Sequence, residues 1–346
     1  MKFLNAAVLF SHNKPLEVLS LEIPLLKEGQ VLVKIDYSGV CRSQLMEFKG
    51  LRGEDKWLPH LLGHEASGQV VDIGKNVKKI KRYDEVILSW IKGNGFDAAP
   101  PKYRSGKFII NSGPITTFSN YSIVSENRVV RKPITLEKKH AALYGCAIPT
   151  GAGIVLNQLK PHKDQVILVC GLGGIGISAI FALKALGIKN IIAVDNNPKK
   201  LSYVRKFVKC TLNFNIGIKA IQNKIKKLFP SGVDAAIDSA GKIETIEFCF
   251  EILHQSKGKL YFASHPENNE KIKINPYDLI CGKQIYGSWG GDIKPDHDFD
   301  NINSLFMKKN IPLDDMIKKI YRLNDINNAL TDLDNGKVMR PIIKME

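Results

Sequence analysis

A glycine-rich turn between an apolar run and a helical repeat constrains this chain more than any other stretch. Gly171, Gly173 and Gly176 are spaced G-x-G-x-x-G. The preceding stretch, 165–169, is apolar enough for a short buried strand, and the apolar residues that follow the turn recur at helical spacing: Ile177, Ile180, Phe181, Ala185 and Leu186. A strand, a tight turn and a helix in direct succession predict one unit of a doubly wound α/β sheet.

The glycines have separate tasks in such a turn. Gly171 allows the tight turn, Gly173 lets the backbone approach a pyrophosphate, and Gly176 lets the helix pack closely on the strand. The helix starts around Gly174, where free N–H groups and a partial positive charge face the phosphates. These features predict a site for the pyrophosphate of a dinucleotide.

An acidic residue completes the pattern. A second apolar run, 190–194, ends in Asp195, nineteen residues after Gly176. A carboxylate at this place binds both hydroxyls of the adenosine ribose and repels a 2′-phosphate. The alternative is a glycine-rich turn without a ligand, but the strand, glycines, helix, second strand and acid all agree. We therefore expect a dinucleotide site that prefers NAD(H) to NADP(H).

The length of 346 residues is comfortable for two domains. From about residue 150 the chain alternates between apolar runs and helical patterns. The predicted strands span 165–170, 190–194, 233–238, 258–263 and 284–288, and the predicted helices span 174–187, 198–209, 216–229 and 242–254. This alternation predicts a parallel sheet with helices between its strands.

The first 145 residues have a different rhythm, mostly that of β-strands. Val31, Val33, Ile35 and Tyr37 alternate with polar residues, as in a half-buried strand. Further strands are expected at 68–74, 84–88, 121–124 and 128–130, with a long loop at 92–116. From about residue 289 we expect helices at 297–308 and 325–334 and a final apolar run at 340–345. This last segment need not belong to the parallel sheet.

The formal net charge of +16 leaves two interpretations open. The lysines are spread along the chain, which favours a lysine-rich surface, while an anionic small-molecule substrate remains the alternative. No basic stripe with interleaved aromatic residues occurs, so nucleic acid is not an expected partner. The six cysteines form no C-x-x-C and no apolar run is long enough to span a membrane. We expect a cytoplasmic protein without disulfides and without a membrane partner.

Three further residues point to metal chemistry when they are taken together. Cys41, His64 and Cys146 are the residue types of a catalytic zinc site, in which two thiolates and one imidazole leave a fourth position open. Taken singly, each has a plainer interpretation, as a small buried apolar residue or a hydrogen-bonded histidine. Spacing alone does not join them across more than a hundred residues.

With these segments side by side, the chain resembles the zinc-dependent alcohol dehydrogenases of the medium-chain dehydrogenase/reductase superfamily over essentially its whole length. The resemblance rests on five motifs: Gly39–Ser43, Gly63–Glu65, Gly145–Cys146 with Thr150–Gly151, Gly171–Gly176 with Asp195, and Gly336–Pro341. It implies a GroES-like, mostly-β catalytic domain at 1–148 and a Rossmann domain at 149–288. It also implies that 289–346 returns to the catalytic domain.

The resemblance also implies roles for single residues. Cys41, His64 and Cys146 would bind the catalytic zinc, Glu65 would sit beside the metal, and the Ser43 hydroxyl would take the proton of the substrate. Other matching positions concern the coenzyme: Arg42 and Arg340 for its pyrophosphate, Thr150 beside the nicotinamide, and Ile175 behind the ring. Plainer interpretations remain for some of these, with Arg42 and Arg340 as surface charges and Ile175 as core packing.

The chain departs from the family pattern in three places. The segment 89–103 lacks the four cysteines that bind a structural zinc in many relatives, so we expect one zinc per chain. Gln44 stands where many members have an aspartate that orients the zinc-bound histidine, and its amide oxygen is expected to accept from the imidazole. Met46 replaces a histidine that ends a proton relay in some members. The group that takes over this outer step is not evident from the sequence.

The implied activity is hydride transfer between NAD(H) and an alcohol or polyol and its aldehyde or ketone. The metal makes the substrate hydroxyl acidic near neutral pH. One alternative is a phosphorylated or nucleotide-linked sugar or polyol as substrate. Others are an inactive binding protein on the same fold and a zinc-free quinone reductase. We expect substrate specificity to lie in 89–117 and near Trp289, and the resemblance suggests a homo-oligomer, a dimer or tetramer.

Overall fold

The computed structural model describes residues 2–346 and divides them into two compact units. The first unit holds the residues up to Ala147 together with Lys294–Ser304 and Pro312–Glu346, and the second holds Ile148–Ile293 and Leu305–Ile311. The C-terminal segment therefore joins the first unit from 294 rather than from 289, and 305–311 goes with the second unit. The reason for the latter is packing, because the ring of Phe306 meets that of Phe181 edge to face at 6.4 Å.

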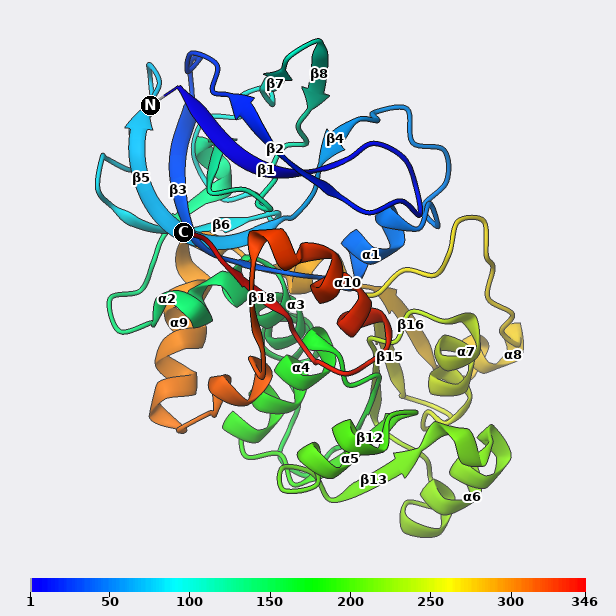
Figure 1. Cartoon of the computed structure of the whole chain (residues 1–346). Coiled ribbons are helices and arrows are strands. Elements are labelled where there is room, and N and C mark those ends of the chain that lie inside the picture. The colour runs from blue at the N-terminus through cyan, green and yellow to red at the C-terminus, as the bar shows by residue number, and fades with distance from the viewer. Residues whose placement is uncertain (1) are drawn as a thin grey trace. The chain divides into compact units, whose positions relative to one another are not determined.

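The second unit is built on one six-stranded sheet in which every strand pair is parallel (Figure 1). Its order is β13 (Cys210–Asn213), β12 (Asn190–Asp195), β11 (Val166–Cys170), β14 (Ala235–Asp238), β15 (Lys259–Phe262) and β16 (Gln284–Gly287). Helices connect the strands: α4 (Gly174–Ala185), α5 (Pro198–Val204), α6 (Ile218–Leu228), α7 (Ile243–Glu251) and α8 (Pro276–Ile280). The predicted parallel, doubly wound sheet is confirmed.

One edge of this sheet departs from the prediction. The helix expected at 198–209 ends at Val204, and the strand β13 follows it. The Lys209 N–H donates to the Ile191 carbonyl and Cys210 pairs with Ile192, so sheet pairing takes over where helical propensity would continue. A four-residue strand in which only Leu212 is fully buried has too little apolar alternation to be recognised from sequence.

The first unit combines a closed barrel with a second sheet (Figure 1). The barrel contains β1 (Phe3–Leu9), β2 (Glu17–Glu22), β7 (Lys102–Ser105), β8 (Phe108–Asn111) and β4 (His60–Leu61). The second sheet contains β10 (Val129–Arg131), β6 (Glu85–Ser89), β5 (Glu65–Ile73), β3 (Gln30–Gly39), β18 (Ile342–Lys344) and β17 (Ile320–Arg322), with β9 (Tyr121–Ser125) also paired to β3. Alternating strand residues such as Val31, Val33 and Ile35 supply its core.

The segment expected to be a long loop, 92–116, contains a hairpin. Strands β7 and β8 pair antiparallel around Gly106, which takes a φ of +56° in the turn. Tyr103 is buried inside the barrel and its hydroxyl accepts the Ile123 N–H. Each strand has four residues, so the alternation is too short to mark them in sequence.

The remaining helices complete the two units. They are α1 (Arg42–Phe48), α2 (Lys138–Ala141), α3 (Ala147–Gly153) with a π-helical turn at Ile154–Leu159, α9 (Pro295–Lys308) and α10 (Ile326–Asp334). The end of the chain lies in the first unit, because β18 pairs antiparallel with β3. Among the described helices, none has the length and apolar character needed to cross a membrane.

Candidate active site

Three segments of the first unit bring a metal-ligand set together. Cys41 precedes α1, His64 stands directly before β5, and Cys146 precedes α3. The two sulfur atoms and a ring nitrogen of His64 lie within 4.8 Å of one another. The pairing of β3 with β5 brings Ser38 opposite Ala66, and so places Cys41 and His64 at the same end of these strands.

The donor set fits zinc. Nε2 of His64 is buried and has no hydrogen-bond partner, so this nitrogen is open to a bound cation beside the two cysteine sulfurs. The hydrogen bond from the Cys146 thiol is the largest effect on Cys41, and together with the positive charge of Arg340 it holds the Cys41 pKa well below its usual range. The same hydrogen bond and burial raise the pKa of Cys146. One thiolate is thus already favoured, and a cation would favour the second.

Gln44 connects two of these ligand-bearing segments, but not in the expected way. Its Oε1 accepts the Cys41 N–H at 2.9 Å, so the side chain bonds to the residue that begins the helix. Its amide nitrogen is the atom that faces Nδ1 of His64. In the structure the amide oxygen therefore bonds to the Cys41 backbone and the amide nitrogen faces the imidazole, which differs from the expectation.

Glu65 and Arg340 form a buried ion pair beside the ligands. Glu65 is fully buried and Arg340 is 3% exposed, so the interpretation of Arg340 as a surface charge is wrong. A Cβ at Gly39 would overlap the Glu65 carboxylate, and one at Gly145 would lie 2.6 Å from Glu65 Cβ. The two motif glycines thus make room for the acid. Burial raises the pKa of Glu65 while the guanidinium of Arg340 opposes that rise.

Helix α1 carries the remaining expected residues of this unit. The Oγ of Ser43 is buried and has no hydrogen-bond partner, so the hydroxyl is available to a bound molecule. Arg42, one residue earlier, is exposed. Met46 is buried, and its thioether side chain has no exchangeable proton with which to continue a proton relay.

The glycine-rich turn of the second unit has the geometry of a phosphate cradle. Gly171 takes a φ of +86°, and a Cβ there would lie 2.6 Å from Ala240 N. A Cβ at Gly176 would overlap the Gly171 carbonyl, whereas nothing lies within 4 Å of the equivalent position at Gly173. Gly174 is the first residue of α4. Space is therefore open where a pyrophosphate would approach and closed where helix meets strand.

Asp195 takes part in the same turn. Its Oδ2 accepts the Leu172 N–H at 2.6 Å and its Oδ1 accepts the Asn197 N–H at 2.8 Å. Nearby, a Cβ at Gly151 would overlap the Ile175 carbonyl, so the residue after Thr150 packs directly on the start of α4. Asp195 thus bonds to the backbone of the glycine-rich turn, and Gly151, the residue after Thr150, packs against Ile175.

A second group of potential ligands lies in the core of the second unit. Cys170, Asp238 and Cys249 are buried, with one ligand atom of each within 4.8 Å of the others. Burial raises the pKa of Asp238 to about 6 and also raises that of Cys249. The pKa of Cys170 is raised as well, by burial and the charge of Asp238 against an opposing hydrogen bond from Cys249. This environment favours protonated groups, whereas metal ligands must lose their protons.

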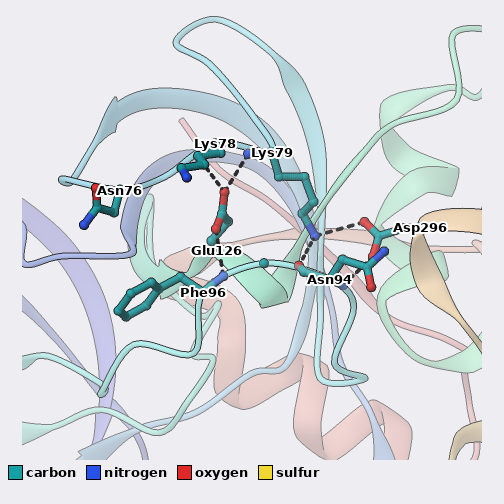
Figure 2. Close-up of a pocket in the computed structure, with 8 residues that line it drawn as sticks. Asn76, Lys78, Lys79, Asn94, Phe96, Glu126 and Asp296 are labelled. Atoms are coloured by element: carbon teal, nitrogen blue, oxygen red, sulfur yellow. Dashed lines mark hydrogen bonds and ion pairs between the residues drawn. The ribbon is translucent and has the colours of Figure 1, made fainter.

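Sequence reasoning missed the two carboxylates that order the cysteine-free segment 89–103 (Figure 2). Glu126 is buried, and its Oε1 accepts the N–H groups of Lys78 and Lys79, both at 2.6 Å, while its Oε2 accepts the Phe96 N–H at 2.7 Å. Asp296 accepts the Asn94 N–H and the Lys79 ammonium. These residues border a groove of about 790 Å³. Nothing in the local sequence identifies the acids, because they lie far along the chain from the segment they hold.

A parallel sheet with a phosphate-binding turn and a separate β unit with a clustered Cys–His–Cys group define a metal-dependent nicotinamide dehydrogenase. Two family models match the chain: "Alcohol dehydrogenase GroES-like domain" over residues 27–134 and "Zinc-binding dehydrogenase" over residues 174–308. The chain belongs to the zinc-dependent alcohol dehydrogenase family, whose members are zinc-binding oxidoreductases that act on CH–OH groups. The expected GroES-like and Rossmann folds are confirmed.

Individual relatives agree with this assignment. S-(hydroxymethyl)glutathione dehydrogenase of Escherichia coli is 28% identical over 98% of this chain and 99% of its own length. The structure of benzyl alcohol dehydrogenase from Acinetobacter calcoaceticus matches all of both chains with a TM-score of 0.89 at 26% identity. An alcohol dehydrogenase zinc-binding domain protein from Burkholderia ambifaria matches with a TM-score of 0.91 at 24% identity, and shows the shared fold.

Proposed function

We propose that this chain interconverts a small alcohol or polyol and its carbonyl compound with one zinc ion held by Cys41, His64 and Cys146. The observation that carries this proposal is the unpartnered, buried Nε2 of His64 beside two cysteine sulfurs. Zinc in such a site polarises the substrate oxygen and makes its hydroxyl proton acidic. Glu65 lies beside the ligands and balances the charge of Arg340.

Other residues accept the substrate proton and bind the coenzyme. Ser43 takes the substrate proton at Oγ, which has no competing partner in the protein. Asp195 and the turn formed by Gly171, Gly173, Gly174 and Gly176 hold the adenosine and pyrophosphate of NAD(H). Following the family pattern, Arg42 and Arg340 support the pyrophosphate, Thr150 lies beside the nicotinamide and Ile175 behind it.

Zinc content per chain tests the ligand set. We expect about one zinc per wild-type chain by elemental mass spectrometry, and almost none in His64→Ala or Cys146→Ser. Cys281→Ser is the matched control, because Cys281 is a free cysteine of the second unit. Unchanged zinc in His64→Ala would contradict the assignment, and two ions per wild-type chain would mean that a second site exists.

The role of Ser43 has a kinetic test. We expect Ser43→Ala to lower kcat by about 10²- to 10⁴-fold, the usual contribution of a positioned proton acceptor, with NADH affinity unchanged. Ser43→Thr keeps a hydroxyl and should retain most of the rate. Equal kcat values for the alanine and wild-type enzymes would remove Ser43 from the proton path.

Substrate class is best decided by a matched panel. Benzyl alcohol, S-(hydroxymethyl)glutathione, a neutral polyol and its phosphorylated form cover the chemistry of the relatives and of the alternative raised by the +16 charge. We favour neutral alcohols. If the phosphorylated polyol gives the higher kcat/KM and its KM rises with salt, the anionic alternative is correct. Binding of NADH without turnover of any substrate would favour an inactive binding protein.

We further propose NAD(H) over NADP(H), on the position of Asp195 at the end of β12. A carboxylate there repels the 2′-phosphate of NADP(H). We expect kcat/KM to be at least about a hundredfold higher with NAD than with NADP, from a repulsion of a few kcal/mol. A ratio near one would overturn the preference.

We also propose that two copies pair through the second unit. Strand β16 ends the parallel sheet, and apolar side chains are exposed on it and around it, including Ile280 at 80%, Trp289 at 82% and Tyr286. Light scattering should give a multiple of the chain mass for the wild type and the single-chain mass for Ile280→Lys with Trp289→Lys. Trp57→Lys, an exposed tryptophan of the first unit, is the control. A monomeric wild type would contradict the proposal.

We propose the cytoplasm as its location. The six cysteines are all free in the structure, which suits a reducing compartment. Fractionation of cells that express the tagged chain tests this proposal, and recovery outside the cytoplasmic fraction would overturn it.

A further inference from the structure

The hydroxyl of Ser239 reaches the backbone of the glycine-rich turn from the neighbouring strand. Ser239 directly follows β14, and its N–H donates to the Cys170 carbonyl at 2.8 Å. Its Oγ lies 2.6 Å from the Gly171 carbonyl and 3.2 Å from the Cys170 carbonyl. The shorter distance identifies the Gly171 carbonyl as the main acceptor.

The same peptide unit is held at its other end by Asp195. The carbonyl of Gly171 and the N–H of Leu172 belong to one planar peptide group. Ser239 donates to that carbonyl, and Oδ2 of Asp195 accepts that N–H at 2.6 Å. The peptide is therefore bonded from both sides, by a residue after β14 and a residue at the end of β12.

The space around the Gly171 carbonyl is small, so only a short side chain can donate a hydrogen bond to it. A Cβ at Gly176 would overlap the Gly171 carbonyl and would lie 2.6 Å from the Ser239 hydroxyl. The backbone of Ser239 is itself held, because the Ser264 hydroxyl donates to its carbonyl at 2.9 Å. A hydroxyl on a short, fixed side chain meets this geometry.

We propose that Ser239 is a positioning residue for the coenzyme, which with Asp195 holds the Gly171–Leu172 peptide so that the next N–H groups face the pyrophosphate. This inference rests on the proposed NAD(H) site at the turn. Rotation of that peptide would reorient the backbone just before Gly173, where the space is open for the ligand. A peptide already held in the binding orientation spares the coenzyme the cost of ordering it.

Coenzyme titration of single variants tests the role of Ser239. We expect Ser239→Ala to weaken NADH binding about tenfold, the effect of one lost hydrogen bond, and to raise the KM for NAD by the same factor. The kcat at saturating NAD should not change, because Ser239 touches no reacting atom. Ser239→Thr keeps the hydroxyl and should restore affinity to within about threefold of wild type.

A matched control separates positioning from a general loss of stability. Thr245→Val removes a buried hydroxyl of the same unit, one that donates to the Lys242 carbonyl at 2.9 Å near the start of α7, outside the glycine-rich turn. It should lower thermal stability about as much as Ser239→Ala while leaving the NADH affinity unchanged. Hydrogen exchange at the Leu172 amide adds a direct readout, since it should accelerate in Ser239→Ala alone.

The outcomes distinguish this inference from the proposed function. If wild type binds NADH and Ser239→Ala binds it within twofold as tightly, the positioning role is wrong and the coenzyme site stands. Equal weakening in Thr245→Val would also overturn it, because the effect would then come from stability. If wild type binds no NADH at all, the proposed function fails and the inference fails with it.

Discussion

Asp238 stands at the end of β14 with its carboxyl group inside the second unit, beside Cys170 and Cys249. One carboxyl oxygen accepts the Gly241 N–H at 3.1 Å, and the other has no hydrogen-bond partner. Burial raises the pKa of Asp238 to about 6, although hydrogen bonds to the carboxyl group, including the one from the Gly241 N–H, oppose this rise. Such a group stabilises the protein when it is protonated and destabilises it when it is charged.

Asp238 makes a contribution of its own to the pH dependence of stability. The pKa in the folded protein lies above the unfolded value of about 3.9, so the contribution is complete below about pH 4 and is lost as pH rises through about 6. The difference between the folded and unfolded pKa values corresponds to about 3 kcal/mol in the free energy of unfolding. Asp238→Asn should lack this change.

Urea unfolding of both proteins between about pH 4.5 and 7 measures the effect, and the difference between wild type and variant removes the contributions of other groups. A difference that stays constant across this range would show that the carboxyl group titrates normally.

At the scale of elements, the segment 89–103 is ordered by carboxylates from distant parts of the chain. The N–H groups of Lys79, Phe96 and Lys78 hold the pKa of Glu126 below its usual range, although burial opposes them. The Ser125 hydroxyl donates to the Phe96 carbonyl and accepts the Ala98 N–H, both at 2.7 Å. The segment therefore has an anchor of its own, made of protein groups (Figure 2).

Removal of this anchor should loosen the segment without a metal being involved. We expect Glu126→Gln to cost about 1.5–3 kcal/mol and to speed cleavage within 89–103 in limited proteolysis, because charged hydrogen bonds to three partly buried N–H groups are weakened. Asp97→Asn is the control, since Asp97 lies in the same segment but is 61% exposed and pairs with Lys92 at its surface. A zinc chelator should leave proteolysis of this segment unchanged. Faster cleavage after chelation without faster hydrogen exchange in β3 and β5 would show that a metal holds the segment itself.

At the scale of the whole molecule, the two units have separate apolar cores. One core of the first unit includes Val33, Val70 and Leu88, and the core of the second includes Leu168, Ile192 and Ile246. The Cys41, His64 and Cys146 group lies entirely in the first unit. Loss of the metal should therefore act on one unit.

Zinc removal tests this division. We expect the stripped enzyme to lose its activity and to show faster hydrogen exchange in β3 and β5, because the ligands then lack the cation that joins them. Exchange in β11 and α4 should stay as in the zinc-loaded protein. Faster exchange in all four elements would mean that the units unfold together, and return of activity on adding zinc back excludes irreversible damage.

The sequence by itself determined the parallel sheet and its glycine-rich turn, because periodicity and motif spacing are local properties. Spacing did not join Cys41, His64 and Cys146, and their grouping was predicted from the family resemblance alone. The short strands β7, β8 and β13 were not predicted, since four residues are too few to show a clear alternation of apolar and polar side chains. Only the tertiary structure decided which atoms meet. The Gln44 oxygen bonds to the backbone of Cys41, Arg340 is buried against Glu65, and Ser239 reaches Gly171 across 68 positions. These contacts depend on strand register and on the space around the glycines, and a short stretch of sequence predicts neither of them.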